Sequence, residues 1–317
     1  MQVNTQKILF IDVVHPVLEE RLTHLGYVCE QDYTSSKQEI ETKIADYFGV
    51  VIRSRLTLDQ TFLDKAINLN FIARSGSGLE NIDLSYAEKR GVKVFNSPEG
   101  NRDALGEHAI GMLLSLFNQL KKGDAEVRGG VWDREGNRGL ELSGKTIGII
   151  GYGNMGSAFA KKLSGFGCGV IAYDKYKSGF SNKNVEEVDL ETLFQKTDVL
   201  SVHLPLSKET HHYVNRVFLS KFKKPIYIIN TARGNNVCVA DLVEGLKSGE
   251  ILGACLDVLE YETKSFETIN SEELPEEFKY LASSDKVIFS PHVAGWTEES
   301  YIKLSSFLAN KIEKEFG

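Results

Sequence analysis

The sequence has few cysteines and prolines and no long hydrophobic run. Among 317 residues there are 4 Cys and 6 Pro. The cysteines, at positions 29, 168, 238 and 255, are too sparse for a disulfide framework and too widely spaced for a CxxC metal or redox motif, so we expect buried, unreactive thiols and no metal site. No uncharged apolar segment approaches the roughly 20 residues that cross a bilayer, and the first residues lack a secretory signal pattern. We expect a cytoplasmic protein.

The sequence also has no excess of positive charge. It carries 37 basic and 44 acidic side chains, a net charge of -7, which provides no overall field for binding nucleic acid or a membrane surface. An anionic ligand must therefore be bound by a local group of basic residues. With 42% hydrophobic and 26% charged residues the composition is that of a globular protein, and the length predicts about two domains.

The first hundred residues alternate between short β-rich runs and helical patterns. Units of this length cannot be joined as hairpins, so they predict an α/β fold with a parallel sheet and helices on both faces. Strands are expected at residues 7–13, 27–30, 49–53, 70–74 and 92–95, and helices at 16–25, 36–47, 58–68 and 84–90.

The rest of the chain predicts a second unit of the same class. A long apolar helix over 102–122 is expected to bridge the two domains, followed by a polar, Gly-rich stretch over 123–144. The alternation restarts with a strand at 146–150 and runs to about residue 290. A last amphipathic helix over 298–315, capped by Thr297, is expected to return to the first domain. The acidic segment 261–279 is expected to lie on the surface.

A glycine-rich motif follows the strand at 146–150. Gly151, Gly153 and Gly156 form GxGxxG between a strand and a helix, and Asp174 ends the next strand 18 residues beyond Gly156. The first glycine permits a tight turn, the second a close approach to a pyrophosphate, and the third close helix packing, while Asp174 would accept from the ribose hydroxyls. The motif predicts NAD rather than NADP, a preference that Lys175 and Lys177 weaken. An unrelated Gly-rich turn is the alternative.

Three chemically useful side chains follow strands of the second unit. His292 comes after the apolar run KVIFS, Arg233 after PIYIIN, and Glu262 after ILGACLDVL. The carboxyl ends of parallel strands meet at one edge, so these residues are expected on one rim. An imidazole beside a carboxylate is suited to proton transfer near neutral pH, and a guanidinium binds a carboxylate through two hydrogen bonds. Taken singly, each residue is more often an ordinary surface residue. The histidines at 15, 108, 211 and 212 are interpreted as structural.

With these motifs in place, the chain resembles the D-isomer-specific 2-hydroxyacid dehydrogenase family over nearly its whole length. The matching stretches are GSGLENID at 76–83, NSPEGN at 96–101, GYGNMG at 151–156, VHLP at 202–205, NTARG at 230–234, GACLDVLEYE at 253–262 and SPHVAGWT at 290–297. The resemblance implies two doubly wound parallel-sheet domains. One is a discontinuous, flavodoxin-like substrate domain over 1–100 and 291–317, and the other is a Rossmann NAD domain over 101–290.

The resemblance also implies an NAD-dependent oxidoreductase and a role for each matching residue. Arg233 would bind and polarise a 2-oxo acid, His292 would exchange the substrate proton, and Glu262 would support His292. The implied NAD contacts are Gly151, Gly153, Asn154, Met155, Gly156, Asp174, His203, Pro205, Thr231, Ala232, Asp257 and Gly295. The loop of Ser75, Gly76, Ser77 and Gly78 would bind the substrate carboxylate through its amides.

The chain departs from the family pattern after the glutamate. Relatives usually have proline there, whereas this chain has Thr263 and a long acidic segment. Glu260 is therefore a rival of Glu262 for the supporting role. Glu262 is preferred because it lies five residues beyond Asp257, the spacing found in relatives.

The substrate is expected to be a small 2-hydroxy or 2-oxo acid. Arg53 and Arg55 lie two apart at a strand end, so they would point to the same side, and Arg74 ends the neighbouring strand. This cluster indicates a phosphorylated acid, and its surroundings resemble short forms of D-3-phosphoglycerate dehydrogenase. Ordinary charged residues flanking a strand remain the alternative. A regulatory domain after the last helix, and serine feedback through it, are not expected.

Three other functions remain open. One is that of a glyoxylate, hydroxypyruvate or other D-2-hydroxyacid reductase. Another is that of a formate or phosphonate dehydrogenase, which would not need a second basic pair. The third is that of a non-catalytic, NAD-sensing protein that resembles corepressors of this fold. The apolar bridging helix and the arm with Val131 and Trp132 predict a homodimer through the NAD domains.

Overall fold

The computed structural model describes residues 6–262 and 274–317, and these divide into two compact units. Unit 1 comprises residues 1–101 and 296–317, and unit 2 comprises residues 102–295. Residues 291–295, expected in the first domain, belong to unit 2, so His292 shares a unit with Arg233 and Glu262. Within the described residues no helix is long and apolar enough to cross a membrane.

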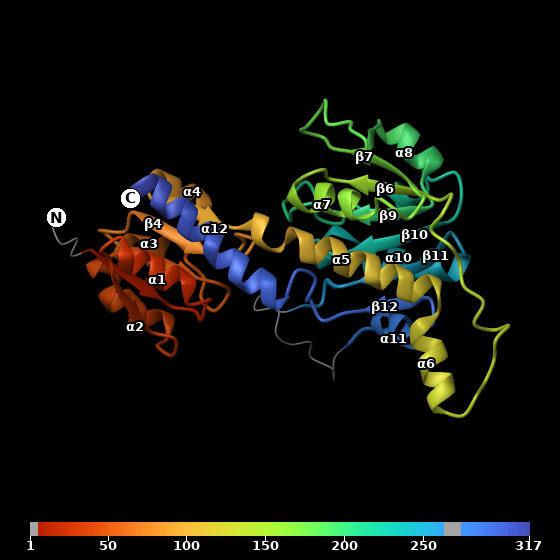
Figure 1. Cartoon of the computed structure of the whole chain (residues 1–317), viewed down its shortest axis with the longest axis horizontal. Helices are drawn as coiled ribbons and strands as arrows, with labels where there is room; N and C mark the ends of the chain where they lie inside the picture. The colour runs from red at the N-terminus through yellow and green to blue at the C-terminus, as the bar shows by residue number, and fades with distance from the viewer. Residues whose placement is uncertain (1–5, 263–273) are drawn as a thin grey trace. The chain divides into compact units, whose positions relative to one another are not determined.

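Unit 1 is built on a five-stranded, all-parallel sheet in the order β2-β1-β3-β4-β5, of which Figure 1 labels β4. This order begins at the second strand and turns back at the first, which is the flavodoxin-like doubly wound topology. The strands are β1 (Lys7–Phe10), β2 (Val28–Gln31), β3 (Tyr47–Ile52), β4 (Phe71–Arg74) and β5 (Lys93–Asn96).

Helices cover both faces of this sheet. One face packs on α1 (Val17–His24) and α12 (Glu298–Phe316) through Leu18, Leu22 and Leu308. The other packs on α2 (Lys37–Lys43), the short η1 (Ile44–Asp46), α3 (Gln60–Lys65) and α4 (Leu84–Lys89). The predicted return of the last helix is observed, and Arg21 of α1 binds Glu313 of α12 with a 2.8 Å Nε–Oε1 hydrogen bond. Thr297 caps α12, as expected.

Unit 2 is built on a seven-stranded parallel sheet in the order β12-β11-β10-β9-β6-β7-β8. Read from β8, this is the Rossmann order. Strands β7 and β8 are added on one side of the first strand, β6, and the later strands β9 to β12 are added on its other side. The strands are β6 (Thr146–Ile150), β7 (Gly169–Tyr173), β8 (Glu186–Glu187), β9 (Val199–Val202), β10 (Ile226–Asn230), β11 (Ile251–Leu256) and β12 (Val287–Phe289).

The helices of unit 2 also form two layers. On one face lie α5 (Pro98–Phe117) and α7 (Asn154–Lys162), packed through Leu113 and Phe159. On the other face lie α8 (Leu190–Lys196), α9 (Arg216–Leu219), α10 (Val239–Ser248) and α11 (Glu276–Ser283). A one-turn helix, η2 (Gly234–Asn236), follows β10.

The expected helix over 102–122 is wrong at both ends. α5 begins at Pro98 and ends at Phe117, whose carbonyl accepts from the amide of Leu140 (2.9 Å) instead of continuing the helix. Gln119 then takes a left-handed backbone (φ 50°). A separate helix, α6 (Leu120–Arg128), occupies the start of the stretch expected to be irregular.

Candidate active site

Arg233, Glu262 and His292 follow three neighbouring strands of unit 2. β10, β11 and β12 pair in parallel, with Asn230 opposite Leu256 and Leu256 opposite Phe289. The three strands therefore end level with one another, and the three side chains follow at the carboxyl edge of the sheet. This is the edge at which open α/β sheets bind ligands.

His292 and Glu262 form a direct hydrogen-bonded pair. The Nδ1 atom of His292 lies 2.6 Å from Oε2 of Glu262, and both side chains are largely buried. The other carboxylate oxygen, Oε1, accepts from the backbone amide of Leu259. A carboxylate on Nδ1 keeps a proton there and stabilises the imidazolium, so Nε2 can take up and return a substrate proton.

His292 also has a left-handed backbone, with φ 53°. A non-glycine residue in this region costs free energy and persists where the surrounding contacts hold it. Here its amide donates to the carbonyl of Asp257 (2.8 Å), which fixes the backbone at the turn.

The rival glutamate is engaged elsewhere. Oε2 of Glu260 lies 2.9 Å from Nε2 of His212, so Glu262, and not Glu260, contacts His292. The acidic segment that follows lies mostly outside the described residues, because 263–273 are not described.

Asp257 stabilises the loop that carries His292. Its carboxylate, only 2% exposed as a residue, accepts from the hydroxyl of Ser290 (2.6 Å) and the amides of Val293 and Ala294 (both 2.9 Å). His108 of α5 joins the network, with Nε2 2.8 Å from the Ser290 hydroxyl. These three donors orient the Asp257 carboxylate toward the loop over 290–294, and the NAD contact at Asp257 stays a prediction.

Arg233 lies in a tight turn between β10 and η2. Its amide donates to Oδ1 of the fully buried Asn236 (3.1 Å), and Nη1 donates to the carbonyl of Ala232 (2.7 Å). The next residue, Gly234, packs so closely that a Cβ there would lie 2.0 Å from the carbonyl carbon of Leu259. The turn that carries Arg233 thus abuts the turn that carries Glu262.

The three glycines of the GxGxxG motif have three different surroundings. Gly151 has φ +88° and faces the carbonyl of His203, which a Cβ would approach to 2.5 Å. Gly156 packs against the carbonyl of Gly151, at 2.1 Å from an ideal Cβ. Gly153 has nothing within 4 Å of its Cβ position. Two glycines are thus required by the fold, and the third borders open space at the start of α7, where backbone amides favour a diphosphate.

Asp174 stands directly after β7, as the motif requires. Its Oδ2 accepts from the amide of Tyr152 (2.8 Å) and its Oδ1 from the amides of Tyr176 (2.9 Å) and Lys177 (3.0 Å). These bonds orient the carboxylate at the end of the strand and satisfy it in part, since each carboxylate oxygen can accept two hydrogen bonds. The residues fit the dinucleotide site expected for NAD.

The other residues predicted to contact NAD differ in how exposed they are to solvent. Asn154 and Pro205 are exposed and Met155 is partly exposed, whereas Thr231, Ala232 and Gly295 are buried. The hydroxyl of Thr231 has no hydrogen-bond partner among the described residues.

The imidazole of His203 packs inward against α7, and the cofactor contact predicted for this residue stays a prediction. Its ring packs on Phe159 at 5.4 Å, and Nε2 lies 2.9 Å from the hydroxyl of Ser201. Nδ1 is buried without a partner among the described residues. Burial lowers the pKa of His203 to about 3, so the imidazole is neutral at physiological pH.

Arg55 of unit 1 is committed to the fold. It donates from Nε to the carbonyl of Ile11 (2.7 Å), from Nη1 to Ser35 (2.6 Å) and from Nη2 to Asp32 (3.0 Å). All three nitrogens thus bind backbone carbonyls, and Asp12 lies 4.0 Å away. The predicted role of Arg55 in binding substrate is therefore corrected.

Arg53 and Arg74 have different surroundings. The guanidinium of Arg53 lies 4.2 Å from the ring centre of Trp296, and its carbonyl accepts from Nε of Arg74 (3.2 Å). Arg74 in turn fills the space beside Gly76, which has φ +147°. Arg53 and Arg74 are thus neighbours at the carboxyl edge of the sheet in unit 1.

The loop over 75–78 begins with an amide that is already used. The amide of Ser75 donates to the carbonyl of Ile52 (2.8 Å), so it is not a donor for substrate, which corrects that part of the expectation. The hydroxyl of Ser77 donates to Asn101 (2.6 Å), which holds the loop in place. The roles of Gly76, Ser77 and Gly78 stay predictions.

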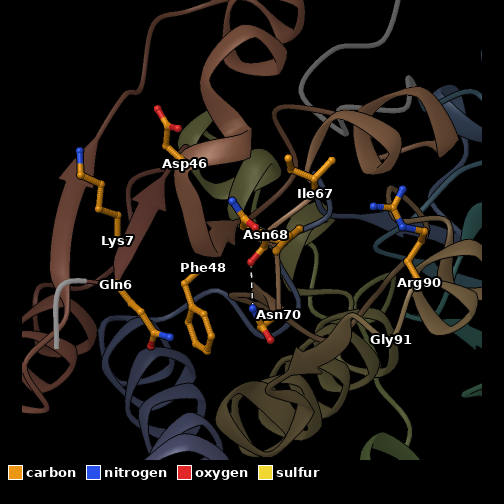
Figure 2. Close-up of a pocket in the computed structure, with 10 residues that line it drawn as sticks. Gln6, Lys7, Asp46, Phe48, Ile67, Asn68, Asn70, Arg90 and Gly91 are labelled. Atoms are coloured by element: carbon orange, nitrogen blue, oxygen red, sulfur yellow. Dashed lines mark hydrogen bonds between the residues drawn. The ribbon is translucent and has the colours of Figure 1, made fainter.

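A hollow of about 780 Å³ lies at the opposite edge of the same sheet (Figure 2). It is lined by Lys7, Phe48, Asn70 and Arg90 among others, residues that precede or begin strands or end a helix. Ligands of doubly wound sheets bind at the carboxyl ends of strands, so this hollow is not the catalytic site. Among residues 6–262 and 274–317 there is no group of three metal-ligating side chains.

Sequence reasoning missed His212 and the pair of His108 and Ser290. A histidine in a polar loop or on an apolar helix carries no local signal of its partner. The partners Glu260 and Asp257 are 48 and 149 residues away in sequence, and only folding brings them together.

The described geometry agrees with comparisons to known proteins. Residues 110–294 match the family model for the NAD binding domain of D-isomer specific 2-hydroxyacid dehydrogenases. A hydroxypyruvate reductase of Thermotoga maritima is 36% identical over 281 residues, which cover 89% of each chain. The chain belongs to the D-isomer specific 2-hydroxyacid dehydrogenase family.

The chain is also similar to two further proteins, one by sequence and one by structure. A D-3-phosphoglycerate dehydrogenase of Archaeoglobus fulgidus is 33% identical over 95% of this chain, which spans 56% of that longer protein. The crystal structure of a D-lactate dehydrogenase from Aquifex aeolicus, complexed with NAD and lactic acid, aligns with a TM-score of 0.80 at 26% identity, covering 98% of this chain and 95% of that one. This chain is thus an NAD-dependent D-2-hydroxyacid dehydrogenase, an oxidoreductase with the predicted two-sheet α/β fold.

Proposed function

We propose that Arg233, Glu262 and His292 carry the reaction, and that its substrate pair is D-3-phosphoglycerate and 3-phosphohydroxypyruvate. The observation that carries the catalytic part is the 2.6 Å contact between His292 Nδ1 and Glu262 Oε2, on the same sheet edge as Arg233 and the glycine turn. NAD, when bound, accepts the hydride from substrate C2 and its reduced form returns it.

The residues of the chain handle the proton and the charge. In oxidation, Nε2 of His292 accepts the proton of the C2 hydroxyl while the C2–H bond breaks and the C2=O double bond forms. Glu262 stabilises the resulting imidazolium through Nδ1. Arg233 binds the substrate carboxylate and polarises the 2-oxo oxygen, which lowers the barrier for the reverse reaction.

The discontinuous domain that includes residues 1–100 would bind substrate, and the other would bind NAD through Gly151, Gly153, Gly156 and the carboxylate of Asp174. The open space at Gly153 and the position of Asp174 after β7 support this assignment.

The phosphate assignment rests on Arg53 and Arg74. These two arginines of the predicted cluster are neighbours at the carboxyl edge of the sheet in unit 1, where Arg74 Nε donates to the carbonyl of Arg53. A phosphate is well suited to two guanidinium groups, because each offers a planar fork of donors.

Reduction of hydroxypyruvate or glyoxylate is the second candidate. It is favoured by the hydroxypyruvate reductase relative, which this chain matches over 89% of both lengths, whereas the phosphoglycerate dehydrogenase of Archaeoglobus fulgidus is matched over 56% of its own.

The deciding experiment measures NADH oxidation with phosphohydroxypyruvate, hydroxypyruvate, glyoxylate and pyruvate. We expect kcat/KM for phosphohydroxypyruvate to exceed that for hydroxypyruvate at least about tenfold, and Arg53→Ala or Arg74→Ala to remove that advantage. Arg138→Ala, at an exposed surface pair with Glu135, is the matched control. If hydroxypyruvate or glyoxylate is the better substrate, or if Arg53→Ala lowers all four rates equally, the second candidate replaces the first.

We also propose a homodimer through the arm of unit 2. Trp132 is 79% exposed, and Leu120, Val127, Val131 and Leu140 of the same arm are also exposed large apolar side chains. Such a group favours burial against another copy. Light scattering should give twice the chain mass, and Trp132→Glu should give the monomer; a monomeric parent protein contradicts the proposal.

A further inference from the structure

His212 has an unfavourable backbone conformation in the loop after β9. Its φ is 49°, in the left-handed region, which glycine adopts without strain and histidine rarely does. A side chain that strains its own backbone is kept there by the contacts it makes. Those contacts indicate what the imidazole does.

The imidazole and the amide of His212 bind two different segments. Nε2 lies 2.9 Å from Oε2 of Glu260, whose side chain is 17% exposed. The backbone amide donates to the carbonyl of Asn235 (2.6 Å), and the nearby amide of Val214 donates to Asn236 (2.9 Å). His212 thus joins the turn after Arg233 to the segment that contains Glu260.

Glu260 belongs to the turn that positions Glu262. The amide of Glu262 donates to the carbonyl of Leu259 (3.2 Å), and Oε1 of Glu262 accepts from the amide of Leu259. The remaining oxygen of Glu262 is the one that contacts His292. A displacement of this turn therefore moves the carboxylate that supports the imidazole.

We propose that His212, acting through Glu260, is a positioning residue for the Glu262–His292 pair. The inference rests on the proposed roles of Glu262 and His292. His212 holds the turn over 259–262 from one side, while Gly234 packs against it through the backbone. The His212–Glu260 pair thereby connects the turn that carries Arg233 to the turn that carries Glu262.

The other titratable groups around the pair are His211, Tyr261 and Cys238. The ring of His211 packs on that of His212 at 4.1 Å, and the charge of Glu260 acts on both Tyr261 and Cys238. Burial is the main cause that raises the pKa of Tyr261 and of Cys238, so both stay neutral near pH 7. Among the described contacts, Glu260 forms its ion pair with His212.

The test uses His212→Gly, because glycine relieves the backbone strain and removes only the imidazole. We expect Tm at or above that of the parent, unchanged NADH binding, and kcat for reduction lower by at least about tenfold. The basic limb of the kcat/KM profile should move to lower pH, because a displaced carboxylate stabilises the imidazolium of His292 less. Glu260→Gln should show the same shift in smaller measure.

Two further variants separate positioning from other effects. His212→Gln keeps a side-chain N–H donor and should recover part of kcat and of the pH profile, and His211→Gln should leave both at parent values. A His212→Gly enzyme with parental kcat and pH profile overturns the inference, as does a loss confined to the KM for NADH. Parental activity in His292→Asn would overturn the proposed catalytic roles themselves. In that case the His212 variants should not change the pH profile. Loss of activity in His292→Asn with parental behaviour in His212→Gly would overturn only the positioning role of His212.

Discussion

The carboxyl edges of the two sheets carry similar residues that do different work. In unit 1, Arg55 donates from three nitrogens to three backbone carbonyls and stabilises the loops around it. In unit 2, His292 and Glu262 bind each other, and the backbone around them holds this pair in a strained turn. The same place in an α/β sheet therefore does not by itself define a functional residue. The partners of the polar atoms distinguish a residue that holds the fold from one prepared for chemistry.

The largest expected difference concerns His292. His292→Asn should lower kcat about 10²- to 10⁴-fold, because the side chain proposed to exchange the substrate proton is lost. NADH oxidation with a 2-oxo acid measures kcat, and NADH fluorescence checks that the cofactor still binds. His24→Gln, an exposed histidine of α1, is the control and should keep parental activity. More than about a tenth of parental kcat in His292→Asn would remove the imidazole from the mechanism.

Arg55 tests the other side of the comparison. Arg55→Ala leaves three carbonyl oxygens without their charged donor and should lower the free energy of unfolding by about 2–3 kcal/mol, with KM for substrate near the parent value. Urea denaturation and steady-state kinetics measure the two effects. Arg53→Ala is the matched variant and should show the opposite pattern, a raised KM with little change in stability. A raised KM in Arg55→Ala at parental stability would return Arg55 to the substrate site.

His203 sharpens the comparison within unit 2, since it follows β9 at the same edge but turns inward. Its folded pKa of about 3 lies below the ordinary value near 6.5, so below pH 6.5 the unfolded chain binds a proton that the folded chain does not. Stability is therefore lost as the pH falls, by about 2 kcal/mol from this residue between pH 7 and pH 5.

His203→Gln should remove this part of the pH dependence, because glutamine does not titrate. Urea denaturation of parent and variant at pH 7, 6 and 5 measures the difference. Parallel stability curves for the two proteins would mean that the imidazole is not buried as described.

Gly153 gives the smallest expected effect. Gly153→Ala places a methyl group in space with no neighbour within 4 Å, so the fold should tolerate it. NAD affinity should fall about tenfold, because the proposed diphosphate position would lie in that space. Titration with NADH measures the affinity. Gly111→Ala in α5, also without a neighbour within 4 Å, is the control and should leave affinity unchanged. Equal affinities in both variants would place the diphosphate elsewhere.

Much of the fold was predictable because it depends on local patterns. The alternation of strands and helices, the glycine motif between β6 and α7, and the threonine cap of α12 are each written in a few consecutive residues. The end of α5 was not predictable from local residues. Gln119 takes a left-handed backbone there, and the carbonyl of Phe117 accepts from the amide of Leu140, which lies 23 positions later along the chain.

The site was predictable in its residue types and less so in its contacts. Position after a strand singled out Arg233, Glu262 and His292, whereas only the structure shows that the Asp257 carboxylate accepts from the loop of His292 and that the His203 imidazole packs on Phe159. Which way a side chain turns at a strand end depends on the packing of neighbouring strands and loops. The spacing of residues in the sequence does not predict this direction.

The sequence by itself determined the class of molecule: the repeated strand and helix periods, the glycine turn, and the set of basic, acidic and imidazole groups that follow strands. Only the tertiary structure decided that Glu262 rather than Glu260 reaches His292, that Arg55 stabilises loops, and that His212 binds Glu260. Local patterns follow from the geometry of a few residues, whereas a hydrogen bond needs two atoms within about 3 Å, and the folded chain alone sets that distance between residues far apart in sequence.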